Sequence, residues 1–121
     1  MKILKSIPTT THTLHVVYVE VNKKLYFVLR GLVEVKSESL SSGKVIETLN
    51  TGLFKNLEYI RKGKLYFIKS QKGFSTLNQE LYLRGNNKLI TQCHDGINLK
   101  LETYSNDKLK LSERYDLNNL S

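Results

Sequence analysis

The chain has 121 residues, which suits one domain with one hydrophobic core, and its 40% apolar content excludes a disordered chain. Nineteen Lys and Arg against 11 Asp and Glu give a formal charge of +8, which favours anionic partners and also solubility. The single cysteine, Cys93, excludes an internal disulfide.

The first half of the sequence alternates as β-strands do, and helical periodicity is hard to find. Residues 1–11, which include the lone Pro8, are compatible with an extra strand, a short helix or a flexible arm. Strands are predicted over residues 13–21 (TLHVVYVEV) and 24–36 (KLYFVLRGLVEVK), with Gly31 at a bulge or bend. The turn SLSSGK and the strand KVIETLN follow.

The second half continues the same rhythm of short strands and turns. LFKNLEYIRK passes through Lys62-Gly63 into KLYFIKSQ as a hairpin, and TLNQELYLR ends at the turn GNN. KLITQCH runs into Asp95-Gly96, the strongest tight-hairpin signal, before INLKLETY, the turn SND and KLKLSERYDL. The pattern predicts a single all-β domain over residues 1–121, an antiparallel meander of eight or nine strands. We expect a small, closed or nearly closed barrel, with a β-sandwich as the second choice.

The tetrapeptide KLYF occurs at residues 24–27 and again at 64–67. The residues that follow the two copies do not match, so we interpret the similarity as convergent strand composition rather than duplication. Alternation places Leu25 and Phe27 on one face of the first copy, and Leu65 and Phe67 on the equivalent face of the second. We expect these residues to face the core, backed by a second face of tyrosines and arginines. That second face comprises Tyr26, Arg30, Tyr59, Arg61, Tyr66, Tyr82 and Arg84.

Three interpretations of the tyrosine–arginine face stay open. It is an ordinary solvated exterior, a platform on which nucleic-acid bases stack, or a barrel lumen that orients a carboxylate ligand. The nucleic-acid interpretation is supported by a basic window without an acid, expected to cluster at one end of the sheet around a hairpin turn. Its members are Arg61, Lys62, Lys64, Lys69 and Lys72.

Enzymatic chemistry has little support in the sequence. Cys93, His94 and Asp95 are adjacent, but on a strand the first two point to opposite faces and the third belongs to the turn, so they cannot form a catalytic triad. His12 and His15 also diverge, and no metal-binding spacing or glycine-rich phosphate loop occurs. We expect no catalytic residue and no metal site.

The amino-terminal segment MKILKSIPTTTH has too short an apolar run for a secretory signal, and no apolar stretch reaches membrane-spanning length. We therefore expect a soluble intracellular protein. The Lys-, Asn- and Ile-rich composition without tryptophan resembles that of AT-rich coding sequences, which suggests the cytoplasm or a plastid stroma.

The segment LYLRGNNKLITQCHDGINLKLETYSNDKLKLSERYDL resembles the closing strands of calycin barrels, the group of lipocalins and fatty-acid-binding proteins. Within that group it is similar to the small phycobilin lyases. The resemblance implies a non-catalytic barrel that holds a fatty acid, an open-chain tetrapyrrole or another small carboxylate ligand, with the seven tyrosines and arginines as ligand-binding residues. Any enzymatic activity would be of the chromophore-lyase type, attaching the chromophore to another protein. The alternative is a basic nucleic-acid-binding or virus-encoded protein-interaction protein with an acidic partner.

Overall fold

The computed structural model describes residues 1–8, 12–31, 35–39, 41–42, 45–49 and 57–120. Within these ranges the regular elements are strands, and their pairings are antiparallel. The same ranges contain no helix long and apolar enough to cross a membrane. The strands are β1 (Lys2–Pro8), β2 (His12–Val19), β3 (Lys24–Gly31), β4 (Val35–Ser39), β5 (Val45–Leu49), β6 (Tyr59–Lys62), β7 (Leu65–Ile68), β8 (Gln79–Leu83), β9 (Asn87–Gln92), β10 (Asn98–Ser105) and β11 (Lys108–Asp116).

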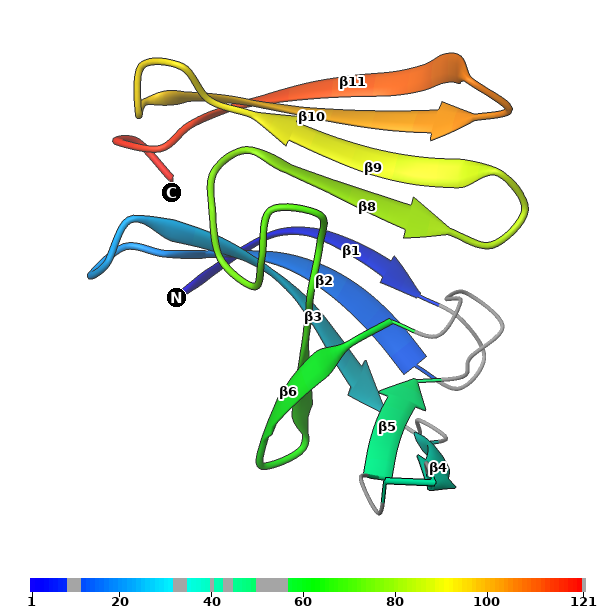
Figure 1. Cartoon of the computed structure of the whole chain (residues 1–121). Helices are drawn as coiled ribbons and strands as arrows, with labels where there is room; N and C mark the ends of the chain where they lie inside the picture. The colour runs from blue at the N-terminus through cyan, green and yellow to red at the C-terminus, as the bar shows by residue number, and fades with distance from the viewer. Residues whose placement is uncertain (9–11, 32–34, 40, 43–44, 50–56, 121) are drawn as a thin grey trace.

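The strands form three sheets. The five-stranded sheet has the order β1-β2-β3-β7-β6, the four-stranded sheet has the order β11-β10-β9-β8, and β4 and β5 form a separate ribbon (Figure 1). The four-stranded sheet is a simple meander, whereas β7 pairs with β3 across the intervening β4–β5 ribbon. The all-β, antiparallel prediction is therefore confirmed.

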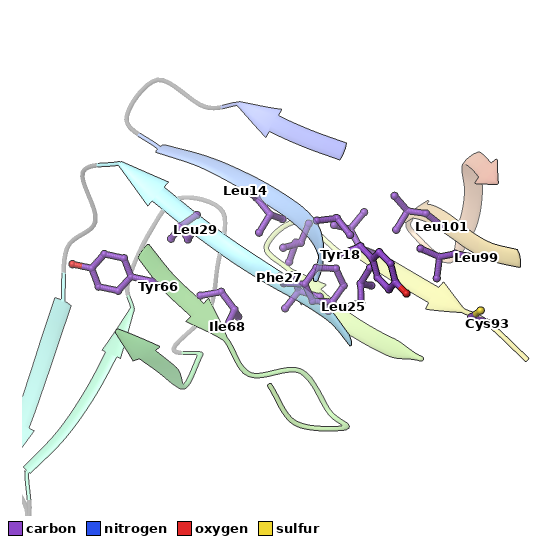
Figure 2. Close-up of a cluster of buried hydrophobic side chains, with 14 of the residues drawn as sticks. Leu14, Tyr18, Leu25, Phe27, Leu29, Tyr66, Ile68, Cys93, Leu99 and Leu101 are labelled. Carbon is purple, nitrogen blue, oxygen red and sulfur yellow. The ribbon is translucent and has the colours of Figure 1, made fainter. Parts of the chain in front are cut away.

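The two larger sheets share one hydrophobic core. Leu14, Phe27 and Leu29 of the five-stranded sheet are fully buried, as are Leu89 and Leu101 of the four-stranded sheet. All of them belong to a single cluster of buried side chains (Figure 2). Strand pairing among the described residues does not join one larger sheet to the other, so a closed barrel is not observed there, and the two sheets share the core as separate sheets.

The first and last strands meet at one side of these two sheets. Residues 2–8 form β1, the extra strand that the sequence left open, while residues 9–11 lie outside the described residues. The Lys5 ammonium of β1 forms an ion pair with Glu113 of β11, and the Tyr115 hydroxyl donates to the same carboxylate at 3.1 Å. Burial and the neighbouring Glu113 raise the pKa of Tyr115 to about 12, so this phenol remains a donor at neutral pH.

The two KLYF copies face opposite ways. In β3, Leu25 and Phe27 are fully buried in the core, as expected. In β7 the expectation is wrong, because Tyr66 and Ile68 are the buried residues and Leu65 and Phe67 are only partly buried. The register explains the reversal: Tyr66 lies directly opposite the buried Leu29, and directly paired residues of antiparallel strands share a face.

The segment between β7 and β8 carries the chain from one sheet to the other. The Thr76 amide and the Gln79 side-chain amide both donate to the Leu25 carbonyl, at 3.1 Å each. Gln79 is 1% exposed, so this polar side chain links β8 to the end of β3 within the core region. The two hydrogen bonds connect this segment and β8 to β3, in addition to the packing of the shared core.

The turn signals of the sequence mostly fall where the chain reverses. Gly63 and Gly85 have positive φ angles of 61° and 72° in the turns after β6 and β8. At Asp95-Gly96 the connection is longer than a tight two-residue hairpin, because β9 ends at Gln92 and β10 begins at Asn98. The Asp95 carboxylate accepts hydrogen bonds from the Ile97 and Asn98 amides, which satisfies the backbone of the wider loop.

Candidate binding face of the five-stranded sheet

The seven tyrosines and arginines of the predicted second face lie in three separate places. Tyr26 and Arg30 lie on the outer face of the five-stranded sheet, away from the core. Tyr82 and Arg84 belong to the other sheet and the turn after it; the Tyr82 hydroxyl donates to Glu80 at 3.2 Å. The remaining three, which lie on β6 and β7, are on the inner face. The single shared face expected from alternation is therefore wrong.

The β6–β7 hairpin brings those remaining three residues together. The rings of Tyr59 and Tyr66 have centroids 5.5 Å apart, and the Arg61 guanidinium lies 5.6 Å from the centre of the Tyr66 ring. Tyr66 is buried at one end of the hydrophobic cluster, with Cys93 at the other end (Figure 2). Because the Arg61 Nε also donates to the Gly63 carbonyl at 3.0 Å, this arginine closes the hairpin and shields the end of the core.

The basic window divides between the two ends of β7. Arg61, Lys62 and Lys64 lie at the β6–β7 turn, where clustering was expected. Lys69 and Lys72 follow the other end of the strand, and Lys69 forms an ion pair with Glu58 at 3.0 Å. Only the three residues of the turn therefore form a local group of cations.

The outer face of the four-stranded sheet carries a carboxylate as well as cations. Glu102 accepts a hydrogen bond from the Tyr104 hydroxyl at 2.9 Å and lies 3.3 Å from the Lys100 ammonium. Lys88 lies 5.0 Å from the centre of the Tyr104 ring and 3.8 Å from the Asp107 carboxylate. Glu102 is only 7% exposed, so these contacts place a buried carboxylate beside a lysine and a tyrosine on this face.

The five-stranded sheet has a different charge pattern. Its strands β1, β2, β3, β6 and β7 contain no aspartate or glutamate. They do contain Lys2, Lys5, Lys24, Arg30, Arg61 and Lys62. The register and alternation assign Lys24, Arg30 and Lys62 to the outer face. We call this surface the outer basic face, and its members are Ile3, Ser6, Pro8, Thr13, His15, Val17, Val19, Lys24, Tyr26, Val28, Arg30, Ile60, Lys62, Leu65 and Phe67.

Aromatic and branched apolar side chains form the centre of the outer basic face. Val28 lies directly opposite Phe67, and Val17 lies directly opposite Tyr26. The Tyr26 and Phe67 rings meet edge to face, with centroids 5.4 Å apart and planes inclined at 80°. Both rings are partly exposed, and Ile60 beside them is 45% exposed. Val17 and Val28 are only 3% and 2% exposed, so the accessible part of the centre consists of the two partly exposed rings and Ile60.

Cations border this centre on the side of the β6–β7 turn. The Lys62 ammonium lies 5.6 Å from the centre of the Phe67 ring, and Arg30 is exposed on β3 in the row that contains Leu65 and Lys62. Two interstrand spacings separate Arg30 from Lys62, about 10 Å. Arg61 points to the opposite face, over Tyr66, but it belongs to the same turn.

A histidine lies next to the cations of the outer basic face. His15 shares a hydrogen bond of 2.8 Å with the Ser6 hydroxyl. Burial, followed by the positive charge of Arg30, lowers the pKa of His15 from its usual 6.5. The imidazole is therefore neutral at physiological pH and becomes a further cation only in more acidic solution.

Two surface cavities lie beside β8 rather than on the outer basic face. One, of about 440 Å³, is lined by Leu57, Tyr82, Lys88 and the asparagines of the adjacent turns. The other, of about 260 Å³, also includes Leu57 and Tyr82. Of the predicted ligand-binding residues, Tyr82 is the one that lines these cavities.

The cysteine–histidine–aspartate run lies after the end of β9 rather than on a strand, and the Cys93 thiol donates to the Asp95 carboxylate with a distance of 3.8 Å. Cys93 is buried, His94 is exposed, and Asp95 binds the loop backbone. Burial raises the pKa of the Cys93 thiol, which disfavours a reactive thiolate. Within the described ranges, no group of three or more His, Cys, Asp or Glu side chains is arranged to hold a metal ion.

No protein-family model matches the chain, and neither a curated protein nor a solved structure matches it significantly. The candidate site therefore rests on its own geometry and charge.

Tyr26, Arg30 and Lys62 were predicted from the sequence as candidate binding residues, whereas Phe67 was expected in the core. The second KLYF copy gave no signal for the correct facing, because all four residues 65–68 are apolar or aromatic. The absence of acids from the strands of the five-stranded sheet was visible in the sequence, but it becomes meaningful only when the strand order is known.

Proposed function

We propose that the protein is a non-catalytic binding module that holds an anionic partner on the outer basic face. The supporting observation is that the strands of this sheet carry cations and no carboxylate, whereas on the outer face of the other sheet the Glu102 carboxylate contacts Lys100 and Tyr104. Cations around a low-dielectric apolar surface attract anions more strongly than cations dispersed in water.

Solubility alone does not explain this arrangement. A solubilising surface keeps its apolar groups dispersed among charges, but Tyr26, Phe67 and Ile60 form a continuous group on the outer basic face. Arg30 and Lys62 border that group on one side. An apolar centre with a polar border is the general anatomy of a recognition surface.

The proposal is tested by removing the two bordering cations. The double variant Arg30→Ala/Lys62→Ala should elute from an immobilised polyanion such as heparin at clearly lower salt than the wild type. The matched control is Lys108→Ala/Lys110→Ala, which removes the same charge from exposed positions on β11 of the other sheet. Equal losses for the two variants would show that net charge, not this face, determines binding.

A small-molecule carrier is the second candidate, because the cavity of about 440 Å³ beside Tyr82 has the size of a ligand pocket. The calycin-like barrel, a tetrapyrrole or fatty-acid ligand, assistance in chromophore attachment and a plastid location remain predictions from the sequence. Titration with a fatty acid or an open-chain tetrapyrrole should change tyrosine fluorescence in the wild type, and Tyr82→Ala should weaken binding. No change in wild-type fluorescence or ligand absorbance would reject this candidate.

A further inference from the structure

We infer that the anionic partner is single-stranded nucleic acid, with its phosphates at the Arg30–Lys62 side and its bases on the Tyr26–Phe67 rings. The inference rests on the proposed function and adds the chemical class of the partner. It depends on three features of the outer basic face: the distance between cations and rings, the accessibility of the rings, and the use of the strand backbones.

The first feature is the spacing along the strands. Leu65, in the row of Arg30 and Lys62, is two residues from Phe67, and two residues of a strand span about 7 Å. That is the scale of the distance between a phosphate and the base of the same nucleotide. Arg30 and Tyr26 are four residues apart on β3, about 13 Å, which leaves room for a second nucleotide.

The second feature is that the Tyr26 and Phe67 rings are partly exposed on the face of the sheet. Every nucleic-acid base can stack on an aromatic side chain, so stacking does not depend on the nucleotide sequence. Sheets that bind single strands combine such rings with cations that contact phosphates. Bases inside a duplex are already stacked on each other and cannot lie on Tyr26 or Phe67. The face should therefore prefer single strands to duplexes.

The third feature distinguishes a nucleic acid from an acidic peptide. Extended peptides commonly bind sheets by adding a strand at an edge, where backbone groups are unpaired. The rings lie on β3 and β7, and each of these strands is paired on both sides, β3 with β2 and β7, and β7 with β3 and β6. The outer basic face thus offers side chains only, which suits base stacking and phosphate contacts better than a peptide backbone.

The experiment measures fluorescence anisotropy with three probes at several salt concentrations. The probes are a labelled mixed-sequence 12-nucleotide single strand, its duplex and a labelled oligoglutamate of equal charge. The wild type should bind the single strand most tightly, and affinity should fall as salt rises. Arg30→Ala should reduce the slope of log affinity against log salt by about 0.7, the value for one phosphate contact on a single strand.

The stacking step is tested with ring variants. Tyr26→Ala and Phe67→Ala should each weaken single-strand binding about tenfold, while Tyr26→Phe, which keeps the ring, should bind as the wild type does. Tyr104→Ala is the control, since Tyr104 lies opposite Lys88 on the outer face of the other sheet. Circular dichroism of each variant verifies that it is folded, and Phe67→Leu provides a milder replacement for Phe67→Ala.

The outcomes separate this inference from the proposed function. If the Arg30/Lys62 variant loses heparin retention but the wild type binds duplex or oligoglutamate at least as tightly as the single strand, the nucleic-acid inference is wrong and the proposed function stands. If folded ring variants bind the single strand like the wild type, stacking is wrong. If the wild type is not retained by heparin at all, both proposals fail.

Discussion

The single variants Phe27→Ala and Phe67→Ala remove the same residue from two identical tetrapeptides that face opposite ways. We expect their losses of stability to differ. Phe27 is 0% exposed and lies in the core cluster shared by both sheets. Its truncation removes a fully buried ring and leaves a cavity, which costs about 3–5 kcal/mol. Phe67 is only partly buried and loses mainly its contact with Tyr26, so we expect about 1–2 kcal/mol.

The tyrosines of the two copies should show the reverse order. Tyr66 is 8% exposed in the core cluster, whereas Tyr26 is partly exposed on the outer basic face. Tyr66→Ala should therefore destabilise the protein more than Tyr26→Ala. The loss of stability should therefore be larger for Phe27→Ala than for Tyr26→Ala, and larger for Tyr66→Ala than for Phe67→Ala.

The measurement is urea unfolding followed by circular dichroism, with the free energy of unfolding extrapolated to water. Because a domain of this size has a total stability of only about 5–15 kcal/mol, Phe27→Leu serves as a milder variant if Phe27→Ala does not fold. Similar costs for Phe27→Ala and Phe67→Ala, together with Tyr26→Ala at least as costly as Tyr66→Ala, would refute the reversed facing of β7.

Three further outcomes follow from contacts elsewhere in the fold. Gln79→Ala removes the donor to the Leu25 carbonyl and should lower the free energy of unfolding by about 1–3 kcal/mol; an unchanged urea midpoint would contradict the role of this link. Lys5→Met breaks the partly buried pair with Glu113 and should cost about 1 kcal/mol at low salt and less in 1 M NaCl; a salt-independent loss would point to packing instead. Since the folded state lowers the pKa of His15, the contribution of His15 to stability is complete above about pH 6.5 and declines as pH falls. His15→Asn should therefore lose less stability than the wild type between pH 7 and pH 5. An unaltered pH profile of stability would exclude this contribution.

Local sequence signals were sufficient for the strands and most of their turns. Turn residues such as Gly63 and Gly85 mark reversals because their positive φ angles suit glycine. Strict alternation in KLYFVLR was sufficient to place Leu25 and Phe27 in the core, because the charged Lys24 and Arg30 identify the opposite face as the one in contact with solvent.

The long-range arrangement could not be obtained in the same way. In β7 both faces are apolar, so alternation shows which residues share a face but not which face is buried. Only the pairing with β3 shows that Tyr66 faces the core. That pairing spans the β4–β5 ribbon, which no local pattern predicts. The expected tyrosine–arginine face required several strands to have the same orientation in one sheet. The strands lie in two sheets and β7 is reversed, so the seven residues are not on one face.

The order of strands along the chain also affects how the protein emerges from the ribosome. All strands of the five-stranded sheet precede Gln79, whereas the sheet that covers its inner face ends at Asp116. At about 5–20 residues per second, the nascent chain exposes Leu14, Phe27 and Leu29 for several seconds before their cover has been translated. Chaperones that hold nascent chains would have that interval in which to bind, and a translation pause after Ile68 would lengthen it.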